Sequence, residues 1–450
     1  MKMNAPQTTT GPKNQNRDPI MPSQPQVSTN NTDIARRQFL VRGASVAAAS
    51  VAIGASAIST ASAKDAIIPK EVPDWSRFLG DGVNSNPYGQ PSDFEKDVVR
   101  RTVDWLTPTP ESSVSFAPLY KMHGIITPNG LHFERHHGGV PEIDPAEHIL
   151  LLHGLVDRPL KFSMRDLMRL PSVNRIHFVE CAANTGMEWR GAQLNGVQYS
   201  HGMVSSSEWT GVKLSTLLKE AGVKDTGQWI LIEGADAAGL SRSLPIKKAM
   251  DDCIVAYAQN GEMLRPEQGY PVRLIVPGWE GNINVKWLRR LEIGDKPWHH
   301  REETSKYTDL MPTGKARQFT WEMEAKSVIT SPCPENKLMD KGYHTISGLA
   351  WSGAGKIKRV DVSVDGGRNW QTAALDGLVL PKSLTRFSLP WQWNGNPALL
   401  QSRALDETGY VQPTIKQLRD VRGEWSIYHN NAIQTWHLKK DGVSENVQVG

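Results

Sequence analysis

Cys181 is the residue of this chain whose type and setting best suit chemistry. It follows a strand-like run, residues 175–179 and Glu180, and opens into the loop sequence Ala182-Ala183-Asn184-Thr185-Gly186. An exposed thiolate at the end of a strand suits a soft, redox-active metal, because sulfur ligands select such metals. We therefore expect Cys181 to be a metal ligand rather than half of a disulfide.

The other two cysteines have a plainer interpretation. With three cysteines in all, the chain can form at most one disulfide, so the fold must depend on its hydrophobic core. Cys253 precedes the apolar run Ile254-Val255-Ala256, and Cys333 lies between Pro332 and Pro334. We expect Cys253 to be a buried small apolar residue and Cys333 to lie in a turn.

Further polar residues lie where predicted strands end. His132 and His136 have the spacing of a zinc helix, but Glu134 is one residue out of place for the HExxH motif, so a solvated loop and a functional site remain equally open. Asp236 and the stretch 278–287 also follow strand-like runs, where either ligand-binding loops or solvated surface can occur.

Several common motifs are absent from the sequence. It has no GxSxG nucleophile elbow, no P-loop and no GxGxxG fingerprint. Hydrolase and nucleotide-binding functions therefore have no support. No CxxCH haem-attachment motif occurs either, so we expect no haem in this chain.

Residues 1–63 are typical of a disordered leader that ends in a twin-arginine export signal. Arg36 and Arg37 precede a mildly apolar stretch, residues 46–58, and the small residues 61–63 resemble a cleavage site. No later run reaches the roughly 20 apolar residues of a membrane span. The sequence predicts a periplasmic protein that is exported folded, with a cofactor inserted beforehand, and no membrane association.

The leader also explains the charge. It holds six basic and two acidic residues, so removing it from totals of 51 and 47 leaves 45 of each. A neutral mature chain gives no reason to expect binding to nucleic acid.

The mature length predicts two domains in an α+β arrangement. In residues 64–310, strands are expected at 175–179, 229–232 and 272–276, and helices at 164–170 and 214–221. Residues 295–318 are polar and predict a linker or an extended crossing segment. Residues 311–437 alternate like strands, with a hairpin turn at 365–367, and predict an all-β immunoglobulin-like domain. Residues 438–450 are expected to be a C-terminal tail.

Ordered motifs in both domains resemble the sulfite oxidase family of molybdenum enzymes. In the first domain these are Phe133-Glu134-Arg135-His136-His137, Glu180-Cys181-Ala182-Ala183-Asn184, Glu233-Gly234-Ala235-Asp236, Gly269-Tyr270-Pro271-Val272-Arg273 and Val285-Lys286-Trp287. In the second they are Asp361-Val362-Ser363-Val364-Asp365-Gly366-Gly367 and Tyr410-Val411-Gln412-Pro413. The resemblance implies a molybdopterin-binding catalytic domain followed by a dimerisation domain, and therefore a homodimer.

The resemblance also implies roles for single residues. Cys181 would bind molybdenum beside one molybdopterin. Phe133, Arg135 and His137 would contact the cofactor or the substrate pocket, and Asp236, Asn284 and Lys286 would hold the pterin and its phosphate. Arg422 matches an arginine that the second domain extends toward the active site, although the spacing around it differs. Cys181, Arg135 and Arg422 are thus the expected catalytic residues.

Three positions depart from the family pattern. Thr185 and Gly186 stand where sulfite oxidases have two arginines, and Leu240 stands where they have a tyrosine. A pocket for free sulfite should keep its cations, because burying an unpaired dianion is costly. The departures, and a greater similarity to the sulfane dehydrogenase branch, imply oxidation of a sulfane sulfur on a carrier protein by oxygen-atom transfer, with electrons passed to a c-type cytochrome subunit.

Other functions remain open from the sequence. The same scaffold could serve a periplasmic sulfite dehydrogenase or a sulfoxide reductase, although the simpler reductases lack a second β-rich domain. The chain could also be a cofactor-free secreted binding module. Intact Cys181 and the export signal argue against that alternative, because a protein without a cofactor has little need of folded export.

Overall fold

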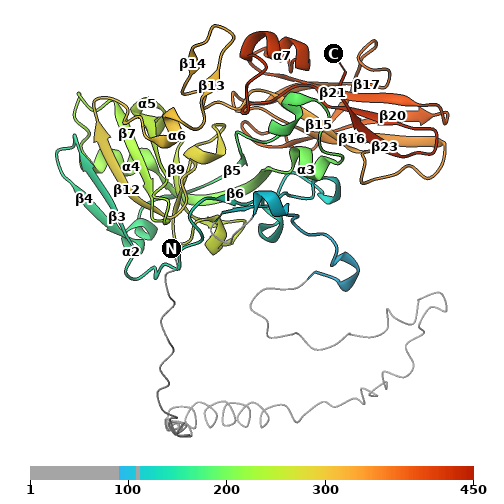
Figure 1. Cartoon of the computed structure of the whole chain (residues 1–450). Coiled ribbons are helices and arrows are strands. Elements are labelled where there is room, and N and C mark those ends of the chain that lie inside the picture. Colours follow the sequence, from blue (N-terminus) through green and yellow to red (C-terminus); the bar gives the residue numbers. More distant parts are fainter. Residues whose placement is uncertain (1–90, 108–111, 450) are drawn as a thin grey trace, which may run out of the picture. The chain divides into compact units, whose positions relative to one another are not determined.

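The computed structural model describes residues 91–107 and 112–449 of the chain, which belong to one compact unit (Figure 1). The predicted export signal, and the predicted catalytic domain up to residue 90, lie outside the described residues. Within the described part, every helix is too short or too polar to cross a membrane.

Two five-stranded sheets form the first half of the described chain. One has the order β4-β3-β12-β7-β8, and only its β3–β12 pair is parallel. The other has the order β10-β9-β6-β5 with β11 paired to β9, and all its pairs are antiparallel. The strands are β3 Ile149–Gly154, β4 Leu160–Ser163, β5 Ser172–Glu180, β6 Val204–Lys213, β7 Trp229–Gly234, β8 Ser241–Pro245, β9 Ile254–Gln259, β10 Glu262–Met263, β11 Arg273–Ile275 and β12 Leu288–Gly294.

Both predicted helices are confirmed. The first, α2 (Met164–Arg169), begins at a capping box, in which the Ser163 hydroxyl accepts from the Asp166 amide. The second, α4 (Leu214–Ala221), ends at Gly222 with φ 69°, which glycine adopts without steric cost. The leucines of α4 are fully buried in the core of this half, where burial of each contributes about 1.5–3 kcal/mol. Two further short helices are α3 Val197–His201 and α5 Ile246–Asp251.

The second half is a β-sandwich, as predicted. Its sheets have the orders β15-β16-β20-β19 and β18-β17-β21-β22-β23, and one hydrophobic cluster is shared between them. The predicted hairpin is also present, because β17 and β18 pair across the turn at Gly366 and Gly367, both with positive φ. The strands are β15 Lys326–Ser331, β16 Gly342–Trp351, β17 Ile357–Ser363, β18 Gln371–Thr372, β19 Ala374–Asp376, β20 Thr385–Trp393, β21 Ala398–Asp406, β22 Thr435–Leu438 and β23 Ser444–Val447.

Two segments differ from expectation. Residues 295–318 are not a plain linker, because they form α6 (Arg301–Thr304) and a two-stranded ribbon of β13 (Asp309–Leu310) and β14 (Ala316–Arg317). Residues 438–450 are not a free tail, because β23 adds a fifth strand to the sandwich by pairing with β22. Short polar strands carry little hydrophobic periodicity, so the sequence pattern did not reveal them.

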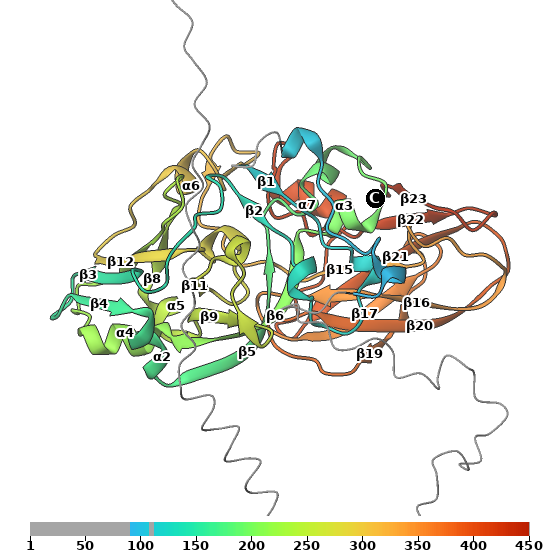
Figure 2. The ribbon, with the colours of Figure 1, turned by 90° about the horizontal axis from the view of Figure 1, so that it is seen from below.

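The two halves meet along β5 and β6, which lie between the other first-half strands and the sandwich in both ribbon views (Figures 1 and 2). Phe178 of β5 is buried in the core of the sandwich rather than in that of its own half. The strand that leads to Cys181 is therefore fixed by both cores. A second ribbon, β1 (Ser113–Val114) with β2 (Arg135–His136), and helix α7 (Ile415–Arg422) complete the fold.

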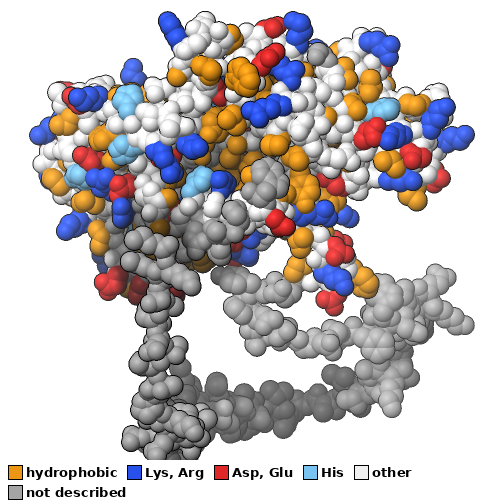
Figure 3. Space-filling view, in the orientation of Figure 1, with side chains coloured by type: hydrophobic (Ala, Val, Ile, Leu, Met, Phe, Trp, Pro, Cys, Tyr) orange, Lys and Arg blue, Asp and Glu red, His pale blue; other side chains and the backbone are white. Residues whose placement is uncertain are grey.

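The surface carries no single sign of charge on the face shown in Figure 3. Lysine and arginine side chains are interspersed with aspartate and glutamate there, and hydrophobic side chains gather across the middle of the molecule.

Candidate functional site

Cys181 lies directly after the last residue of β5 and begins a tight loop. Its amide donates to the Met203 carbonyl at 3.0 Å, and its own carbonyl accepts from the Asn184 amide at 2.8 Å. The side chain is 8% exposed, so the expected exposed thiolate is corrected to a largely buried thiol that faces internal cavities. Burial raises the pKa of the Cys181 thiol, and a bound metal cation would favour its thiolate form.

A polar cavity lies against Cys181 and is built from segments far apart in the sequence. It is lined by seven of the eight residues expected from the sequence, namely Phe133, Arg135, His137, Cys181, Asp236, Asn284 and Lys286. The remaining lining residues lie outside that set of eight, although the sequence left a functional role open for some of them: His132, Glu134, His136, Val179, Leu240, Gln268, Arg273, Gly281, Asn282, Trp287 and Tyr307.

Two buried cations give this cavity its charge. Arg273 donates to the carbonyls of Gln268 and Asn284, both at 3.0 Å, and burial lowers its pKa to about 9. Lys286 donates to the Glu267 carbonyl at 2.9 Å; burial and then the charge of Arg273 lower its pKa to about 7. Because both side chains bond only to neutral carbonyl or amide oxygens, the cavity favours an anionic ligand such as a phosphate.

Two cavity histidines, His132 and His137, have lowered pKa values and are neutral at physiological pH. Burial lowers the pKa of His132 to about 3, and burial followed by the charge of Arg135 lowers that of His137 to about 4. His132 also has its Nδ1 atom 3.0 Å from the Phe133 carbonyl. These side chains therefore offer hydrogen-bonding edges rather than positive charge.

Some buried polar atoms of the cavity lining have no hydrogen-bond partner in the described part of the chain and could bind a molybdopterin cofactor. Three buried nitrogens, His132 Nε2, Arg273 Nε and Asn282 Nδ2, have no hydrogen-bond partner within the described part of the chain. Buried polar groups are normally paired, so these atoms suit a ligand rich in donors and acceptors. A thiol, unpaired polar edges and two cations fit a pterin dithiolene with a phosphate.

Asn284 and Asp236 have structural partners as well as a place in the lining. The Asn284 side chain accepts from the Val276 amide at 2.7 Å and donates to the Glu280 carbonyl at 3.1 Å. Asp236 accepts from the Leu240 amide at 3.1 Å. Both side chains therefore also fix the loops they belong to, and their expected contact with the pterin stays a prediction.

A second cavity, of about 380 Å³, shares Cys181 and Arg135 with the first. Most of its remaining lining is apolar: Val103, Leu106, Val114, Phe116, Ala183, Met187, Leu194, Tyr199, Met203 and Ile427, together with Thr185, Gly186, Arg190, Gln193, Ser200 and Ser426. Cys181 thus borders one polar and one mainly apolar space.

Arg422 is the one expected site residue that lines neither of these cavities. It lies at the end of α7, is 2% exposed, and donates to Glu324 at 2.5 Å, with Asp309 3.6 Å away. It borders a separate cleft of the sandwich. The expected extension of Arg422 toward the Cys181 site is therefore not seen in this geometry.

Neither Arg273 nor Tyr307 was identified as a site residue from the sequence, although the sequence contains a clue to the first of them. Arg273 is a cation within an otherwise apolar strand, and such a charge has to find a partner or a ligand, so it could have been singled out. Tyr307 lies in the polar segment 295–318 and carried no local signal; only the folding of that segment brings its ring into the cavity. Within the described ranges, no group of three or more His, Cys, Asp or Glu side chains is placed to hold a metal ion.

Comparisons with known proteins agree with this picture. Residues 137–302 match the oxidoreductase molybdopterin binding domain, and residues 317–436 match the Mo-co oxidoreductase dimerisation domain. Nitrate reductases [NADH] from Ulva prolifera and Solanum lycopersicum are 32% and 36% identical over 300 and 303 residues. Each alignment covers 60% of this chain but only 34% and 33% of the relative, so the chain spans about a third of these enzymes.

One solved structure matches this chain over almost its own entire length, unlike the nitrate reductases. It is the sulfane dehydrogenase SoxCD from Paracoccus pantotrophus, with 56% identity, a TM-score of 0.82, and coverage of 84% of this chain and 98% of that chain. Both domains and their order are matched, which confirms the expected fold. The chain therefore belongs to the sulfite oxidase family of molybdopterin-dependent oxidoreductases.

Proposed function

We propose that this chain is the molybdenum-binding subunit of a sulfane dehydrogenase of the SoxCD type. The observation that carries the proposal is the 56% identity over 98% of a chain in the SoxCD structure. The alignments with nitrate reductases cover only about a third of those enzymes, so they support the cofactor rather than the substrate.

The site residues have separable tasks in this proposal. Cys181 would bind the metal, and Arg273 and Lys286 would neutralise the cofactor's phosphate. When bound, the molybdenum centre supplies two-electron oxygen-atom chemistry. Arg135 borders both cavities, so it would orient an anionic sulfur group beside Cys181. Each oxygen atom added to the sulfur comes from one water, which releases two protons and two electrons.

The second cavity supports a bulky substrate whose apolar part is larger than that of free sulfite. Its mainly apolar lining suits a sulfane sulfur attached to the cysteine of a carrier protein, such as SoxYZ, better than free sulfite. Leu240, in the polar cavity, adds no charge. Thr185 has a further role, because its hydroxyl donates to the Asn430 carbonyl at 2.5 Å and accepts from Lys326 at 2.8 Å. The threonine at position 185 therefore also forms hydrogen bonds that connect the loop after Cys181 to the second domain.

The two electrons must leave the site one at a time, so we propose a c-type cytochrome partner like SoxD. We also propose folded export through the twin-arginine pathway and a periplasmic location, on the basis of Arg36, Arg37 and the small residues 61–63.

The experiment is to purify the protein with its copurifying partners and to measure cytochrome c reduction with three substrates: a persulfidated carrier protein, sulfite and nitrate. We expect the persulfidated carrier to be oxidised at least about a hundredfold more efficiently than sulfite, a difference of roughly 3 kcal/mol in transition-state binding. Comparable turnover of sulfite would instead indicate a sulfite dehydrogenase. Absence of molybdenum would remove the enzyme proposal and favour a binding module.

A further inference from the structure

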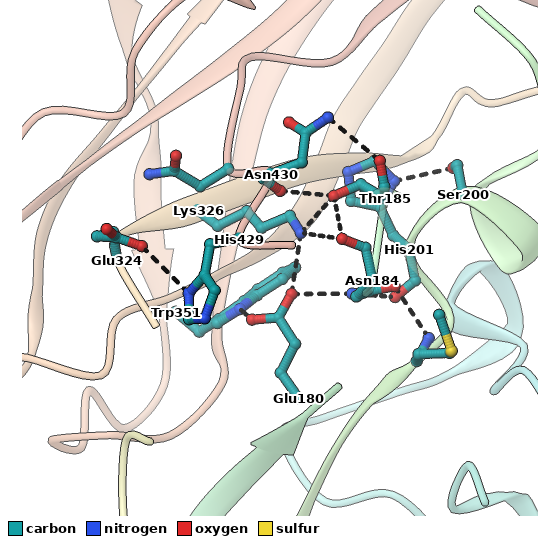
Figure 4. Close-up of polar contacts among 12 residues, drawn as sticks. Glu180, Asn184, Thr185, Ser200, His201, Glu324, Lys326, Trp351, His429 and Asn430 are labelled. Carbon is teal, nitrogen blue, oxygen red and sulfur yellow. Dashed lines mark hydrogen bonds and ion pairs between the residues drawn. The ribbon is translucent and has the colours of Figure 1, made fainter. Parts of the chain in front are cut away.

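The loop that carries Cys181, residues 180–186 and here called the cysteine loop, is held from outside its own half of the molecule. All residues that line the polar cavity lie between His132 and Tyr307. The cysteine loop bonds to Met203 and His201 of its own half, and it also makes buried polar contacts with Lys326 and Trp351 of the sandwich and with His429 and Asn430 (Figure 4).

The first contact is a buried ion pair. Lys326, the first residue of β15, is 1% exposed, and Glu180, the residue before Cys181, is 0% exposed. The Lys326 ammonium donates to Glu180 Oε1 at 2.9 Å. Glu180 also accepts from Asn184 Nδ2 at 2.9 Å and from Trp351 Nε1 at 2.7 Å. The carboxylate thus connects both ends of the cysteine loop to two strands of the sandwich.

The same ammonium also reaches the far end of the loop. Lys326 donates to the Thr185 hydroxyl at 2.8 Å, so it bridges the residues on either side of Cys181 (Figure 4). Thr185 has φ 63°, a conformation that costs a β-branched residue energy and has to be held by its surroundings. Its hydroxyl donates to Asn430, and the Asn430 side chain returns a bond to the Thr185 carbonyl at 3.2 Å.

The second contact is a close approach of main chains. The His429 amide donates to the Ala182 carbonyl at 2.8 Å. A Cβ atom on Gly186 would lie 2.8 Å from the Ile427 carbonyl oxygen, so only glycine lets the two segments approach this closely. The residues next to Cys181 are therefore fixed against a segment more than 240 positions later in the chain.

From these contacts we infer that Lys326, together with residues 427–430, positions Cys181, so that the sandwich holds the metal-binding thiol in place as well as serving as a dimerisation domain. A ligand that supplies one sulfur to a metal must keep a fixed direction, and the contacts from the sandwich add to the bonds that the cysteine loop makes with Met203 and His201. This inference rests on the proposed role of Cys181 as the molybdenum ligand.

A matched control distinguishes two roles of the Lys326–Glu180 ion pair: positioning Cys181, and merely holding the two halves of the molecule together. Lys382 of the sandwich pairs with Asp252 of the first half at 2.6 Å, away from the cysteine loop. Lys382→Met removes one lysine between the same two halves, as Lys326→Met does. Only Lys326→Met removes a contact to the cysteine loop.

The test uses the full-length protein expressed without cofactor. Cys181 borders two cavities, whereas Cys253 and Cys333 are 1% and 0% exposed, so alkylation by iodoacetamide reports mainly on Cys181. In Lys326→Met we expect alkylation of Cys181 and amide exchange over residues 181–186 to accelerate by about tenfold or more, since charge-assisted hydrogen bonds are lost. In Lys382→Met both rates should stay within about twofold of the wild type.

Unchanged rates in Lys326→Met, or equal acceleration in Lys382→Met, would overturn the inference. The single substitution leaves Glu180 buried without its cation, which can prevent folding. In that case Glu180→Gln/Lys326→Met is used, because it removes both charges at similar volume, and the same acceleration is expected. Lys326→Arg, which keeps the charge, should restore at least part of the protection.

Two further measurements separate this inference from the proposed function. Molybdenum content of wild-type holoprotein tests whether the chain binds the metal at all, whatever the mobility of the loop. In holoprotein of Lys326→Met, we expect an altered electron paramagnetic resonance signal from molybdenum, because that signal depends on the direction of the bound sulfur. An unaltered signal would contradict positioning even if the metal is bound.

Discussion

At the scale of single residues, the site combines one thiol with two buried cations, Arg273 and Lys286, that form no ion pair with a carboxylate of the described residues. In the proposed function Cys181 would provide the soft ligand, while Arg273 and Lys286 donate to neutral oxygens and would be available to an anion. Because metal binding and neutralisation of the cofactor's phosphate are assigned to different residues, each role can be tested by its own substitution.

Replacing Cys181 with serine should remove the metal but keep the fold. We expect less than about a tenth of the wild-type molybdenum per chain, since hydroxyl is a poor ligand for a soft metal at neutral pH, and loss of oxidation of the sulfur donor. Elemental analysis and a melting curve measure the two effects. The matched control is Cys253→Ser in the core, which should keep its molybdenum; equal loss in both variants would argue against Cys181 as the ligand.

Lys286 predicts a pH dependence of cofactor loading. Its lowered pKa of about 7 means that the side chain loses its charge as the pH rises through 7, whereas a bound anion favours the charged form. Affinity of the cofactor-free protein for molybdopterin should therefore fall by up to about tenfold per pH unit between pH 7.5 and 9.

Titration of molybdopterin loading at several pH values measures this slope. The cofactor's phosphate is already fully ionised in that range, so its own titration does not contribute. Lys286→Met should bind more weakly at pH 7.5 and show a smaller slope. An equal slope in the variant would assign the pH dependence to another group.

At the scale of elements, the critical feature is the contact between the cysteine loop and residues 427–430. The sequence predicts a loop after Cys181, but it does not single out residues 427–430. Their contact depends on Gly186, whose missing side chain makes room for the Ile427 carbonyl.

Gly186→Ala should therefore disturb this contact. The added methyl group meets a main-chain oxygen that cannot rotate away, so we expect a loss of about 1–3 kcal/mol in the free energy of unfolding and faster exchange over residues 181–186. Denaturant unfolding and mass-spectrometric exchange measure these effects. Gly130→Ala is the control, because its Cβ would meet only the flexible end of Arg265 at 3.3 Å. Equal destabilisation by both changes would mean that the close approach to Ile427 is unimportant.

At the scale of the whole molecule, the sandwich has two expected tasks. Its match to a Mo-co dimerisation domain supports self-association, and its contacts with the cysteine loop support positioning of the thiol. The two tasks do not exclude each other, because Lys326 and Trp351 are buried within a single chain.

We expect the purified chain to be a dimer in solution. Light scattering after size-exclusion chromatography should give a mass twice that of the mature chain at micromolar concentration, and a larger mass when a c-type cytochrome copurifies. Lys326→Met, which acts inside one chain, should leave the dimer intact. A monomer at micromolar concentration would contradict the expected homodimer.

The sequence by itself determined the class of the molecule and most of its site. Local patterns gave helices α2 and α4, the hairpin of β17 and β18, and the thiol at the end of β5, because capping, periodicity and turn chemistry act over a few residues. The family resemblance added six further residues that line the polar cavity. Only the tertiary structure decided what surrounds the thiol: Arg422 turns to Glu324 and Asp309, Tyr307 enters the cavity, and Lys326 reaches Glu180. The contacts of Arg422 and Lys326 join residues more than 90 positions apart, and no local pattern encodes them because they form only when both cores have folded.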